Sequence, residues 1–342
     1  MTPEHRLLAA GRRKPVDATP IWFMRQAGRC LAEYRQLRTS YDIMTLAKTP
    51  ELSARVTLMP VEAFGVDGAV LFADIMLPLE PMGVDLEIQP DIGPIIHNPI
   101  RSRADVDRLR LFEPDEEVAF VMDAIRLVRR ELAGKQAMIG FSGSPFTLAC
   151  YLIEGRPSRD YAVAKAFMYG EPEAWHELMG KLAEVTARYL NAQIRAGVQV
   201  VQLFDSWVGA LSPSDYAAFV QPHVARVFAA VHGAPSIHFG TGTAALLELM
   251  VEAGGDVIGV DARQSLDVAW ERIGFQRGIQ GNLDAARLLA GWEATQDGVR
   301  EVLRRAANRP GHIFNLGHGV LPDTDPGMLT RVVELVHAES AR

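Results

Sequence analysis

Short apolar runs recur along the chain, and each is followed by a polar or glycine-bearing turn and then by a helical stretch. Several runs are almost continuously apolar, which is typical of parallel strands covered on both faces. Strands that alternate with helices through short connections indicate a parallel sheet. Eight repeats favour a closed, distorted (β/α)8 TIM barrel over an open doubly wound sheet. The predicted strands are residues 21–24, 69–72, 137–141, 198–204, 236–239, 257–260, 278–280 and 312–315.

Amphipathic periodicity predicts helices between these strands. Residues 173–196 place apolar side chains at three- and four-residue spacing and end before Gly197, a residue type suited to a helix C-terminus. Residues 214–231 follow Ser212 and a proline, which favour a helix start. Residues 243–253 form a further helical stretch that ends at two glycines. The mixed α/β pattern therefore continues to the end of the chain.

One stretch interrupts the alternation of strands and helices. Residues 77–100 combine prolines with alternating apolar positions, so we expect a β-hairpin insertion there, beside the mouth of the barrel. No linker divides the chain. We therefore expect a single domain over residues 1–342, with residues 1–20 as an N-terminal extension.

Charge and composition limit the classes of molecule that the protein is expected to bind. The 342 residues carry a net charge of −7, whereas the first 38 residues hold eight basic and three acidic side chains, a local charge of +5. An acidic body argues against nucleic-acid binding, and no apolar run approaches the ~20 residues that a membrane span needs. A basic segment on such a body suggests a focused anion site. Two cysteines without a CxxC pair indicate a cytoplasmic protein.

The sharpest local motif is MRQAGR at residues 24–29. Arg25 and Arg29 stand four residues apart around a glycine, directly after a predicted strand. A guanidinium group is a planar, permanently charged fork that pairs with carboxylates at two points, so two of them suit a polycarboxylate or a phosphate. An ion-paired surface turn would show the same spacing.

Other candidate side chains follow the remaining strands, as expected for a barrel site. Asp74 lies in apolar company, where a carboxylate needs donors from loop amides or from a ligand. His318 stands between two glycines that expose it, although a lone histidine is more often structural. Ser206 has no neighbouring histidine, so a serine nucleophile is not indicated. Dinucleotide, P-loop, zincin and α/β-hydrolase motifs are missing from the sequence.

Longer motifs resemble the uroporphyrinogen decarboxylase family. These are PIWFMRQAGR, LFADI, GFSGSPFTLACYLIEG, QLFDSWVG, IHFGTG, GDVIGVD, IQGNLD and FNLGHGVLPDTDP, in the family's order from Pro20 to Pro326. The resemblance implies a distorted barrel, a homodimer, and a carboxy-lyase that uses no cofactor or metal. The implied reaction removes the carboxyl groups of the four acetate side chains of uroporphyrinogen III, giving coproporphyrinogen III in haem and related tetrapyrrole biosynthesis.

The resemblance also implies site residues. The implied catalytic residues are Asp74, Arg25, Tyr151 and His318. The implied substrate-binding residues are Arg25, Gln26, Arg29, Asp74, Tyr151, Ser206 and His318. The substrate is a small molecule, so neither nucleic acid nor membrane is an expected partner. The proton donor stays open between Tyr151, His318 and an arginine.

Two alternatives remain at this point. A cobalamin-dependent methyltransferase-like barrel would need zinc-binding cysteines, and the corresponding place reads His238-Phe239-Gly240. A non-catalytic tetrapyrrole-binding protein would keep Asp74 and the two arginines, because binding and catalysis share them.

Overall fold

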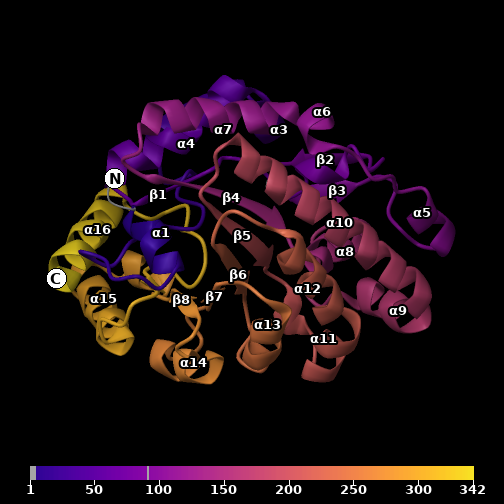
Figure 1. Ribbon diagram of the computed structural model, residues 1–342. Helices are drawn as coiled ribbons and strands as arrows, with labels where there is room; N and C mark the ends of the chain where they lie inside the picture. The colour runs from indigo at the N-terminus through magenta and orange to yellow at the C-terminus, as the bar shows by residue number, and fades with distance from the viewer. Residues whose placement is uncertain (1–4, 91) are drawn as a thin grey trace.

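The computed structural model describes residues 5–90 and 92–342 of the chain. Seven parallel strands form one curled sheet in the order β1-β4-β5-β6-β7-β8-β9, so each strand lies beside the next strand of the sheet along the chain. Figure 1 shows these strands inside a ring of helices. The strands are β1 (Gly68–Val70), β4 (Ala137–Gly143), β5 (Val200–Asp205), β6 (Ser236–Gly240), β7 (Val257–Gly259), β8 (Gly278–Gln280) and β9 (His312–Ile313).

Backbone hydrogen bonds around residue 21 close the sheet into a barrel. The N–H of Phe314 donates to the carbonyl of Pro20 at 2.8 Å, and the N–H of Asp67 donates to the carbonyl of Ile21 at 2.8 Å. Ile21 therefore bridges β9 and β1, where the eighth strand of a (β/α)8 barrel belongs. The barrel prediction is confirmed, and seven of the eight predicted runs contain strands of the sheet.

The predicted strand 21–24 is wrong beyond its first residue. The N–H of Phe23 donates to the side chain of Gln26 at 3.0 Å, and the N–H of Met24 donates to the side chain of Asn315 at 3.1 Å. Side-chain oxygens thus take the donors that a strand would offer to its neighbour. The ladder stops after Ile21, and the barrel is distorted at this seam.

Helices cover the outside of the sheet. The predicted helix 173–196 is confirmed as α10 (Pro172–Ala196). The predicted helix 214–231 is two helices, because Pro222 cannot donate a backbone hydrogen bond and disfavours helical geometry in the residue before it. The helix predicted at 243–253 begins only at Leu247, after a turn in which the N–H of Leu246 donates to the carbonyl of Thr243.

The other helices have the following bounds. They are α1 (Arg6–Gly11), α2 (Ala32–Ser40), α3 (Ile43–Lys48), α4 (Pro50–Phe64), α5 (Arg103–Asp107), α6 (Pro114–Glu117), α7 (Ala119–Leu132), α8 (Pro145–Glu154), α9 (Ala162–Gly170), α11 (Pro213–Phe219), α12 (Gln221–Ala230), α13 (Leu247–Ala253), α14 (Leu266–Ile273), α15 (Trp292–Ala306) and α16 (Pro326–Ser340), with 3-10 turns η1 (Leu77–Leu79), η2 (Val208–Ala210) and η3 (Ala285–Leu289).

Two apolar layers stabilise this arrangement. The larger layer lies between the strands and the outer helices. A smaller cluster fills the barrel interior and includes Trp22, Ile139, Val200 and Phe239. Leu7 of α1 belongs to the interior cluster, so α1 packs against the amino end of the barrel, inside the ring of outer helices (Figure 1). The barrel is therefore closed at one end by the chain itself.

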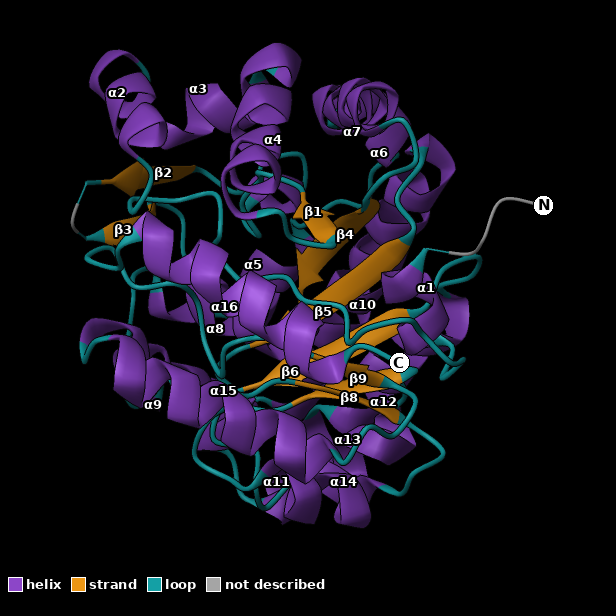
Figure 2. Ribbon diagram, turned by 90° about the vertical axis from the view of Figure 1, so that its left-hand side faces the viewer, coloured by secondary structure: helices purple, strands orange, loops and turns teal. Residues whose placement is uncertain are grey.

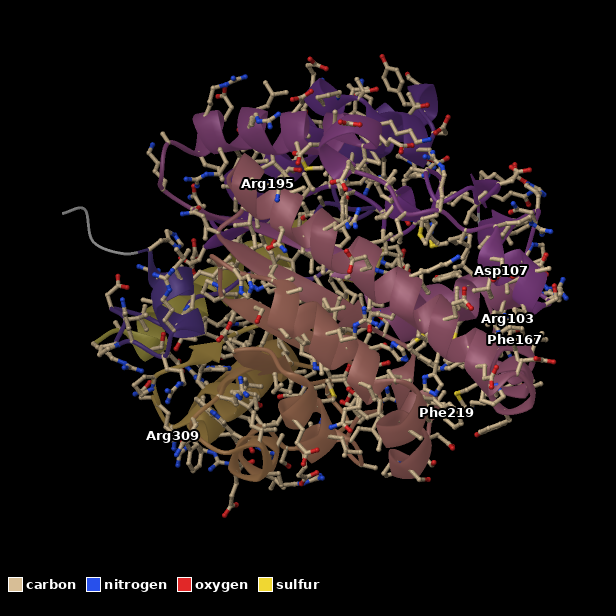
Figure 3. The ribbon with its side chains drawn as sticks, turned by 45° about the vertical axis from the view of Figure 1, so that its right-hand side comes forward. Arg103, Asp107, Phe167, Arg195, Phe219 and Arg309 are labelled. Atoms are coloured by element: carbon tan, nitrogen blue, oxygen red, sulfur yellow. The ribbon has the colours of Figure 1, made fainter. Side chains whose placement is uncertain are left out.

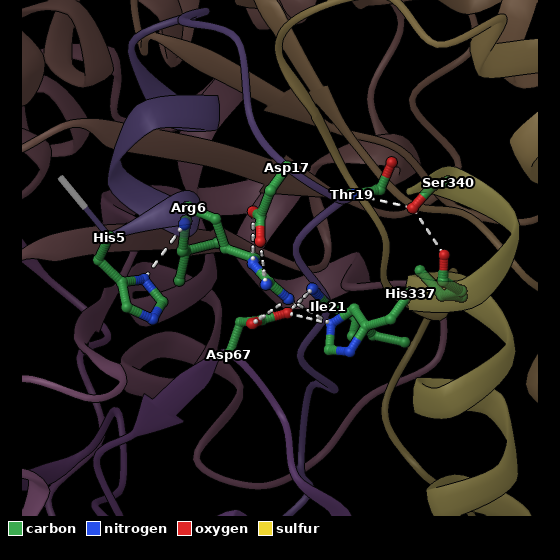
Figure 4. Close-up of polar contacts among 10 residues, drawn as sticks. His5, Arg6, Asp17, Thr19, Ile21, Asp67, His337 and Ser340 are labelled. Atoms are coloured by element: carbon green, nitrogen blue, oxygen red, sulfur yellow. Dashed lines mark hydrogen bonds and ion pairs between the residues drawn. The ribbon is translucent and has the colours of Figure 1, made fainter. Parts of the chain in front are cut away.

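A polar cluster fastens the same amino end. The carboxylate of Asp67 accepts the N–H of Ile21 at 2.8 Å and Nη1 of Arg6 at 3.2 Å, and Nε2 of His337 lies 2.8 Å away. Figure 4 shows these side chains converging from α1, from the start of β1 and from α16. The hydroxyl of Ser340 also accepts the N–H of Thr19 at 2.8 Å. These contacts tie the last helix to the segment that closes the barrel.

The predicted insertion at 77–100 contains an antiparallel hairpin. Its strands are β2 (Leu86–Gln89) and β3 (Gly93–Ile96), paired in register from Leu86 with Ile96. Asp91, which lies between them in the sequence, is outside the described residues, as are residues 1–4 of the predicted N-terminal extension. Figure 2 shows the hairpin on the opposite side of the barrel from α1, which is the side of the carboxyl ends of the strands.

The longest helix, α10, runs across the outside of the barrel. Arg195 near its end pairs with Asp115, and Arg103 of α5 pairs with Glu177 near its start. Figure 3 shows Arg195 of α10 and Arg103 of α5 near opposite ends of the long helix. Within the described ranges, no helix combines the length and the apolar character that a membrane span requires.

Candidate active site

The carboxyl ends of the strands bring the predicted residues to one end of the barrel. Asp74 follows β1, Ser206 follows β5 directly, and His318 follows β9. Tyr151 lies on α8, the helix after β4, and Arg25 follows the bridge at residue 21. Because the strands are parallel, these segments share the face opposite the polar cluster around Asp67.

The MRQAGR turn takes its shape from an unusual backbone at Arg25. Arg25 has a φ of +59°, a left-handed conformation that non-glycine residues rarely adopt. A Cβ on Gly28 would lie 2.9 Å from the carbonyl oxygen of Arg25, so the turn also requires a glycine there. The side chain of Arg25 is exposed and makes no hydrogen bond or ion pair with another residue of the described chain. The ion-paired surface turn considered from the sequence is therefore not what forms.

Gln26 faces the opposite way from Arg25. Its side chain is fully buried, accepts the N–H of Phe23 at 3.0 Å and donates to the carbonyl of Gly68 at 2.9 Å. Both ends of the amide are thus used to join the turn to β1. No part of the Gln26 side chain is exposed to solvent.

Arg25 lies against the loop that carries His318. A Cβ on Gly319 would lie 2.6 Å from Cδ of Arg25, so only a glycine leaves room for the arginine. The N–H of Val320 also donates to the carbonyl of Met24 at 2.9 Å. The first and last segments of the barrel therefore meet at this point, and they bring together two predicted site residues that are distant in sequence.

Asp74 has few donors of its own. Its carboxylate accepts one hydrogen bond from the described residues, from the N–H of Met76 at 2.8 Å. Burial raises the pKa of Asp74, while that hydrogen bond and the charge of Arg25 oppose the increase. The side chain is half-buried, so protein atoms surround it while water still reaches it. Such a half-buried carboxylate leaves lone pairs for donors from a bound molecule.

Tyr151 shares this neighbourhood. Burial and the negative charge of Asp74 raise the pKa of Tyr151, and the charge of Arg25 opposes them. Its ring packs on Trp207 with 4.1 Å between centroids, and Tyr161 packs on the same indole at 4.9 Å. Tyr151 therefore keeps its proton at neutral pH, and its ring is held in place by an aromatic stack.

His318 is exposed at the mouth of the barrel. Partial loss of water around the imidazole and the positive charges of Arg25 and Arg263 lower the pKa of His318, and the charge of Asp261 acts in the opposite direction. The imidazole is therefore neutral at pH 7. A neutral imidazole carries one N–H donor and one acceptor nitrogen.

Ser206 and Arg29 are less tightly connected to this group. The carbonyl of Ser206 accepts the hydroxyl of Thr241 at 2.6 Å, whereas its own hydroxyl makes no hydrogen bond with another described residue. Arg29 is exposed and unpaired within the described chain, and its charge acts on Tyr34. Electrostatic effects link Arg25 with Asp74, Tyr151 and His318 into one cluster, and among the described residues Arg29 acts on none of them.

The motifs did not single out Trp207 or Tyr161, and Arg263 stood only among the polar residues that directly follow the predicted strands. Trp207 directly follows Ser206 and could have been noticed for that reason. Tyr161 becomes relevant only through its contact with Trp207. Arg263 follows β7, so its position at the carboxyl end of a strand was the available signal.

The described residues offer no obvious metal centre. Within residues 5–90 and 92–342, no group of three His, Cys, Asp or Glu side chains is arranged to hold a metal ion. Both cysteines are buried free thiols, and burial raises the pKa of Cys150 well above its usual value. These thiols do not resemble activated zinc ligands.

Comparison with known sequences identifies the family. A sequence model described as uroporphyrinogen decarboxylase (URO-D) matches residues 2–339. The uroporphyrinogen decarboxylase of Sorangium cellulosum (strain So ce56) is 54% identical over 335 residues, which cover 97% of this chain and 96% of that protein. The uroporphyrinogen decarboxylase of Carboxydothermus hydrogenoformans is 53% identical over 98% of this chain and 96% of its own length.

Comparison with solved structures supports the fold. A methyltransferase from Methanosarcina mazei superposes with a TM-score of 0.81 and covers 98% of both chains at 19% identity. A B12-independent methionine synthase from Shewanella sp. W3-18-1 gives a TM-score of 0.54 at 13% identity, covering 89% of this chain and 90% of that one. At such low identity these likenesses show a shared barrel and carry no argument about activity.

Proposed function

The chain belongs to the uroporphyrinogen decarboxylase family and is an enzyme of that type, and from this premise we propose how its residues decarboxylate their substrate. The reaction is a decarboxylation in tetrapyrrole biosynthesis. The proposed substrate is uroporphyrinogen III, whose four acetate side chains become methyl groups in coproporphyrinogen III. The single observation that supports these residue roles best is the half-buried Asp74, which has one protein donor and lies in the electrostatic range of Arg25 and Tyr151.

The chemistry requires an electron sink. A proton added to a ring carbon makes the pyrrole cationic, and the bond between the acetate methylene and its carboxylate then breaks. The electron pair flows into the ring and CO₂ leaves. A second proton converts the exocyclic methylene to a methyl group, and loss of the first proton restores the pyrrole. In net terms one proton is consumed and one CO₂ is released for each acetate.

Asp74 suits the role of the fixed anion in this scheme. Its free lone pairs would accept the pyrrole N–H groups, and its charge would stabilise the ring as it becomes cationic. A carboxylate already set in place does not need to reorganise during the reaction, so it stabilises the transition state more than water would. The substrate ring itself supplies the sink, which requires no prosthetic group from the protein.

Arg25 and Arg29 suit the carboxylates on the rim of the substrate. Both guanidinium groups are exposed and unpaired within the described chain, so each can form a two-point pair with a carboxylate. Gln26 supports them by fixing the turn, and Ser206 offers a free hydroxyl near the aromatic stack. An otherwise acidic protein would attract a polyanionic substrate to this end through these charges.

Two groups of the cluster can deliver the proton. Tyr151 holds its proton because its pKa is raised, and neutral His318 carries one N–H. We propose both as proton-transfer candidates and separate them by experiment. The solvent isotope effect on turnover is measured for Tyr151→Phe and for His318→Gln. If only one of the two variants loses the isotope effect of the slow proton-transfer step, the residue replaced in that variant is the donor.

The decisive experiment incubates the purified chain with uroporphyrinogen III under anaerobic conditions. We expect successive loss of four carboxyl groups. Chromatography of the products, after their oxidation to porphyrins, measures this loss. Tight binding without loss of carboxyl groups would instead support the tetrapyrrole-binding alternative. Activity should also persist after dialysis against a chelator, and inhibition by the chelator would contradict the metal-free mechanism.

Our proposal also covers the setting of the enzyme. We place it in the cytoplasm, which two buried free thiols support because reducing compartments keep thiols unpaired. We propose one domain over residues 1–342 and a homodimer, the latter on the family resemblance alone. Light scattering after size exclusion gives the mass in solution, and a monomer at working concentration would refute the dimer.

A further inference from the structure

A further arginine, Arg263, borders the loop that carries His318. It follows β7, and a Cβ on Gly317 would lie 2.3 Å from the backbone nitrogen of Ala262. The segment that carries Arg263 therefore packs directly on the residue before His318. Because Arg25 lies against the same loop, the His318 loop contacts both arginine-bearing segments.

Hydrogen bonds fix the backbone on both sides of Arg263. The carboxylate of Asp261 accepts the N–H of Gly242 at 2.5 Å and the N–H of Arg263 at 3.0 Å. The side-chain amide of Asn282 donates to the carbonyls of Asp261 and Gln264, both at 2.8 Å. The loops after β6, β7 and β8 are thereby joined, so the position of Arg263 is set before any ligand binds.

The guanidinium group of Arg263 is oriented by Asp261 while its outer edge stays open. Nε and Nη2 lie 2.9 Å and 2.7 Å from the Asp261 carboxylate. Nη1 makes no hydrogen bond with another residue of the described chain, and 69% of the side chain is exposed. Gly242 lies beneath the guanidinium group, where a Cβ would be 3.7 Å from Nη1. No side chain at position 242 competes for that edge.

A purely structural role explains this arrangement less well. Two backbone N–H groups already satisfy the buried Asp261, so the exposed arginine is not needed to satisfy it. An exposed ion pair stabilises a protein by only about 0–1 kcal/mol. The charge of Arg263 does act on His318, together with that of Arg25. The pair therefore resembles a carboxylate that orients a binding cation.

We propose that Arg263 binds a carboxylate on the rim of the tetrapyrrole, as a further substrate-binding residue beside His318. This inference rests on the proposed function of the site. A ring with eight acidic side chains presents more carboxylates than Arg25 and Arg29 can pair. A third guanidinium at the mouth would restrict the rotation of the ring and thus help to select the side chain that reacts.

The test compares Arg263→Gln with the unchanged enzyme on uroporphyrinogen III. We expect KM to rise about tenfold while kcat changes less than about threefold, because a pair held in both ground and transition state contributes uniform binding. Arg263→Lys keeps the charge and loses the fork, so its KM should lie between the two. That second variant preserves the test should Arg263→Gln fold poorly.

A matched control separates binding from stability. Arg272 of α14 forms a similar pair with Glu248 on the outer helices, with 2.8 Å between Nη2 and the carboxylate. Arg272→Gln should leave KM unchanged. The placement of Arg263 is tested without any turnover by nuclear magnetic resonance of His318. Removal of the Arg263 charge should raise the pKa of His318, and an unchanged pKa would overturn the proposal.

Product inhibition identifies which carboxylate is bound. Coproporphyrinogen III keeps the propionates and lacks the acetates. If the inhibition constant of coproporphyrinogen III rises in parallel with KM in Arg263→Gln, Arg263 binds a propionate. If KM rises and this inhibition constant is unchanged, Arg263 binds an acetate.

The two proposals fail in different ways. An unchanged KM in Arg263→Gln, with normal turnover by the unchanged enzyme, would overturn this inference alone. No turnover of uroporphyrinogen III by the unchanged enzyme would overturn the proposed function, and with it this assignment.

Discussion

Two aspartates near the opposite ends of β1 have contrasting surroundings. Asp67, at the amino end, is in contact with the N–H of Ile21, with Arg6 and with His337. Asp74, at the carboxyl end, accepts a single hydrogen bond from the described residues. The two carboxylates are separated by a short strand and a loop. Protein donors nevertheless surround the carboxylate of Asp67 and leave most lone pairs of Asp74 unused.

The arginines repeat this contrast. Arg6 is engaged by Asp17 and Asp67, whereas Arg25 has no ion pair within the described chain. Charges that pair with each other stabilise the closed barrel, and charges left unpaired remain available to a ligand. The amino end of a barrel commonly serves stability and the carboxyl end function. Here that division can be traced along one strand.

The largest expected effect comes from Asp74→Asn. This change removes the fixed negative charge and keeps the shape, so kcat should fall by ~10² or more. Steady-state turnover of uroporphyrinogen III measures it. Near-normal turnover would remove Asp74 from the mechanism.

The stability of Asp74→Asn should move in the other direction. An acid whose pKa is raised by folding favours the folded state below its unfolded pKa, and this contribution is lost as pH rises through the folded pKa. Above its folded-state pKa, the buried charge of ionised Asp74 therefore opposes folding. We expect Asp74→Asn to melt at the same or a higher temperature than the unchanged protein at pH 7, with the difference shrinking as pH falls.

Asp67→Asn should reverse this pattern. It removes a buried charge that pairs with Arg6 and His337, so the free energy of unfolding should fall by about 2 kcal/mol. Chemical denaturation measures the loss. Turnover per folded molecule should stay near normal, and a selective loss of kcat would contradict the assignment of this end to stability.

The arginine turn gives a graded test of intermediate size. Arg25→Lys should lower kcat/KM about tenfold, because charge is kept while two-point pairing is lost. Arg29→Lys should have a smaller effect, since among the described residues Arg29 has no electrostatic effect on the cluster formed by Arg25, Asp74, Tyr151 and His318. An equal or larger loss of kcat/KM in Arg29→Lys would contradict the assignment of Arg25, and not Arg29, to the cluster.

The smallest expected effect is on pH dependence. The charge of Arg25 lowers the pKa of Asp74 against the effect of burial. Arg25→Gln should therefore shift the acidic limb of the activity profile to higher pH, by less than about one unit, because Asp74 then becomes protonated more easily. The pH–activity profiles of both enzymes are measured on the same substrate, so that titration of the substrate affects both profiles equally. A shift to lower pH would contradict the pairing of these two groups.

Local patterns predicted the fold well because burial on both faces leaves continuous apolar runs at the strands. They failed where distant side chains intervene. Residues 22–24 look like a strand, yet the side chains of Gln26 and Asn315 accept the backbone N–H groups of Phe23 and Met24. The helix break before Pro222 was visible in the sequence, and apolar periodicity on both sides of it concealed the interruption.

Motifs could nominate candidate site residues one by one, whereas the arrangement of these residues could not be predicted. Motifs identified Arg25, Asp74, Tyr151 and His318 through a resemblance. Gln26 was included because it adjoins Arg25, but the left-handed backbone at Arg25 turns the two side chains apart. The stack of Tyr151 on Trp207 and the proximity of Arg263 to His318 depend on contacts between loops, which spacing along the chain does not encode.

The left-handed backbone at Arg25 also determines which truncation of this side chain is cleanest. Alanine at this position would inherit a conformation that costs a side-chain-bearing residue roughly 1 kcal/mol, and valine or isoleucine would fare worse. Glycine occupies that region freely. Arg25 already bears this cost, so Arg25→Ala deletes the guanidinium group and leaves the backbone contribution unchanged, whereas Arg25→Gly would combine loss of the guanidinium group with relief of the strain in one measurement.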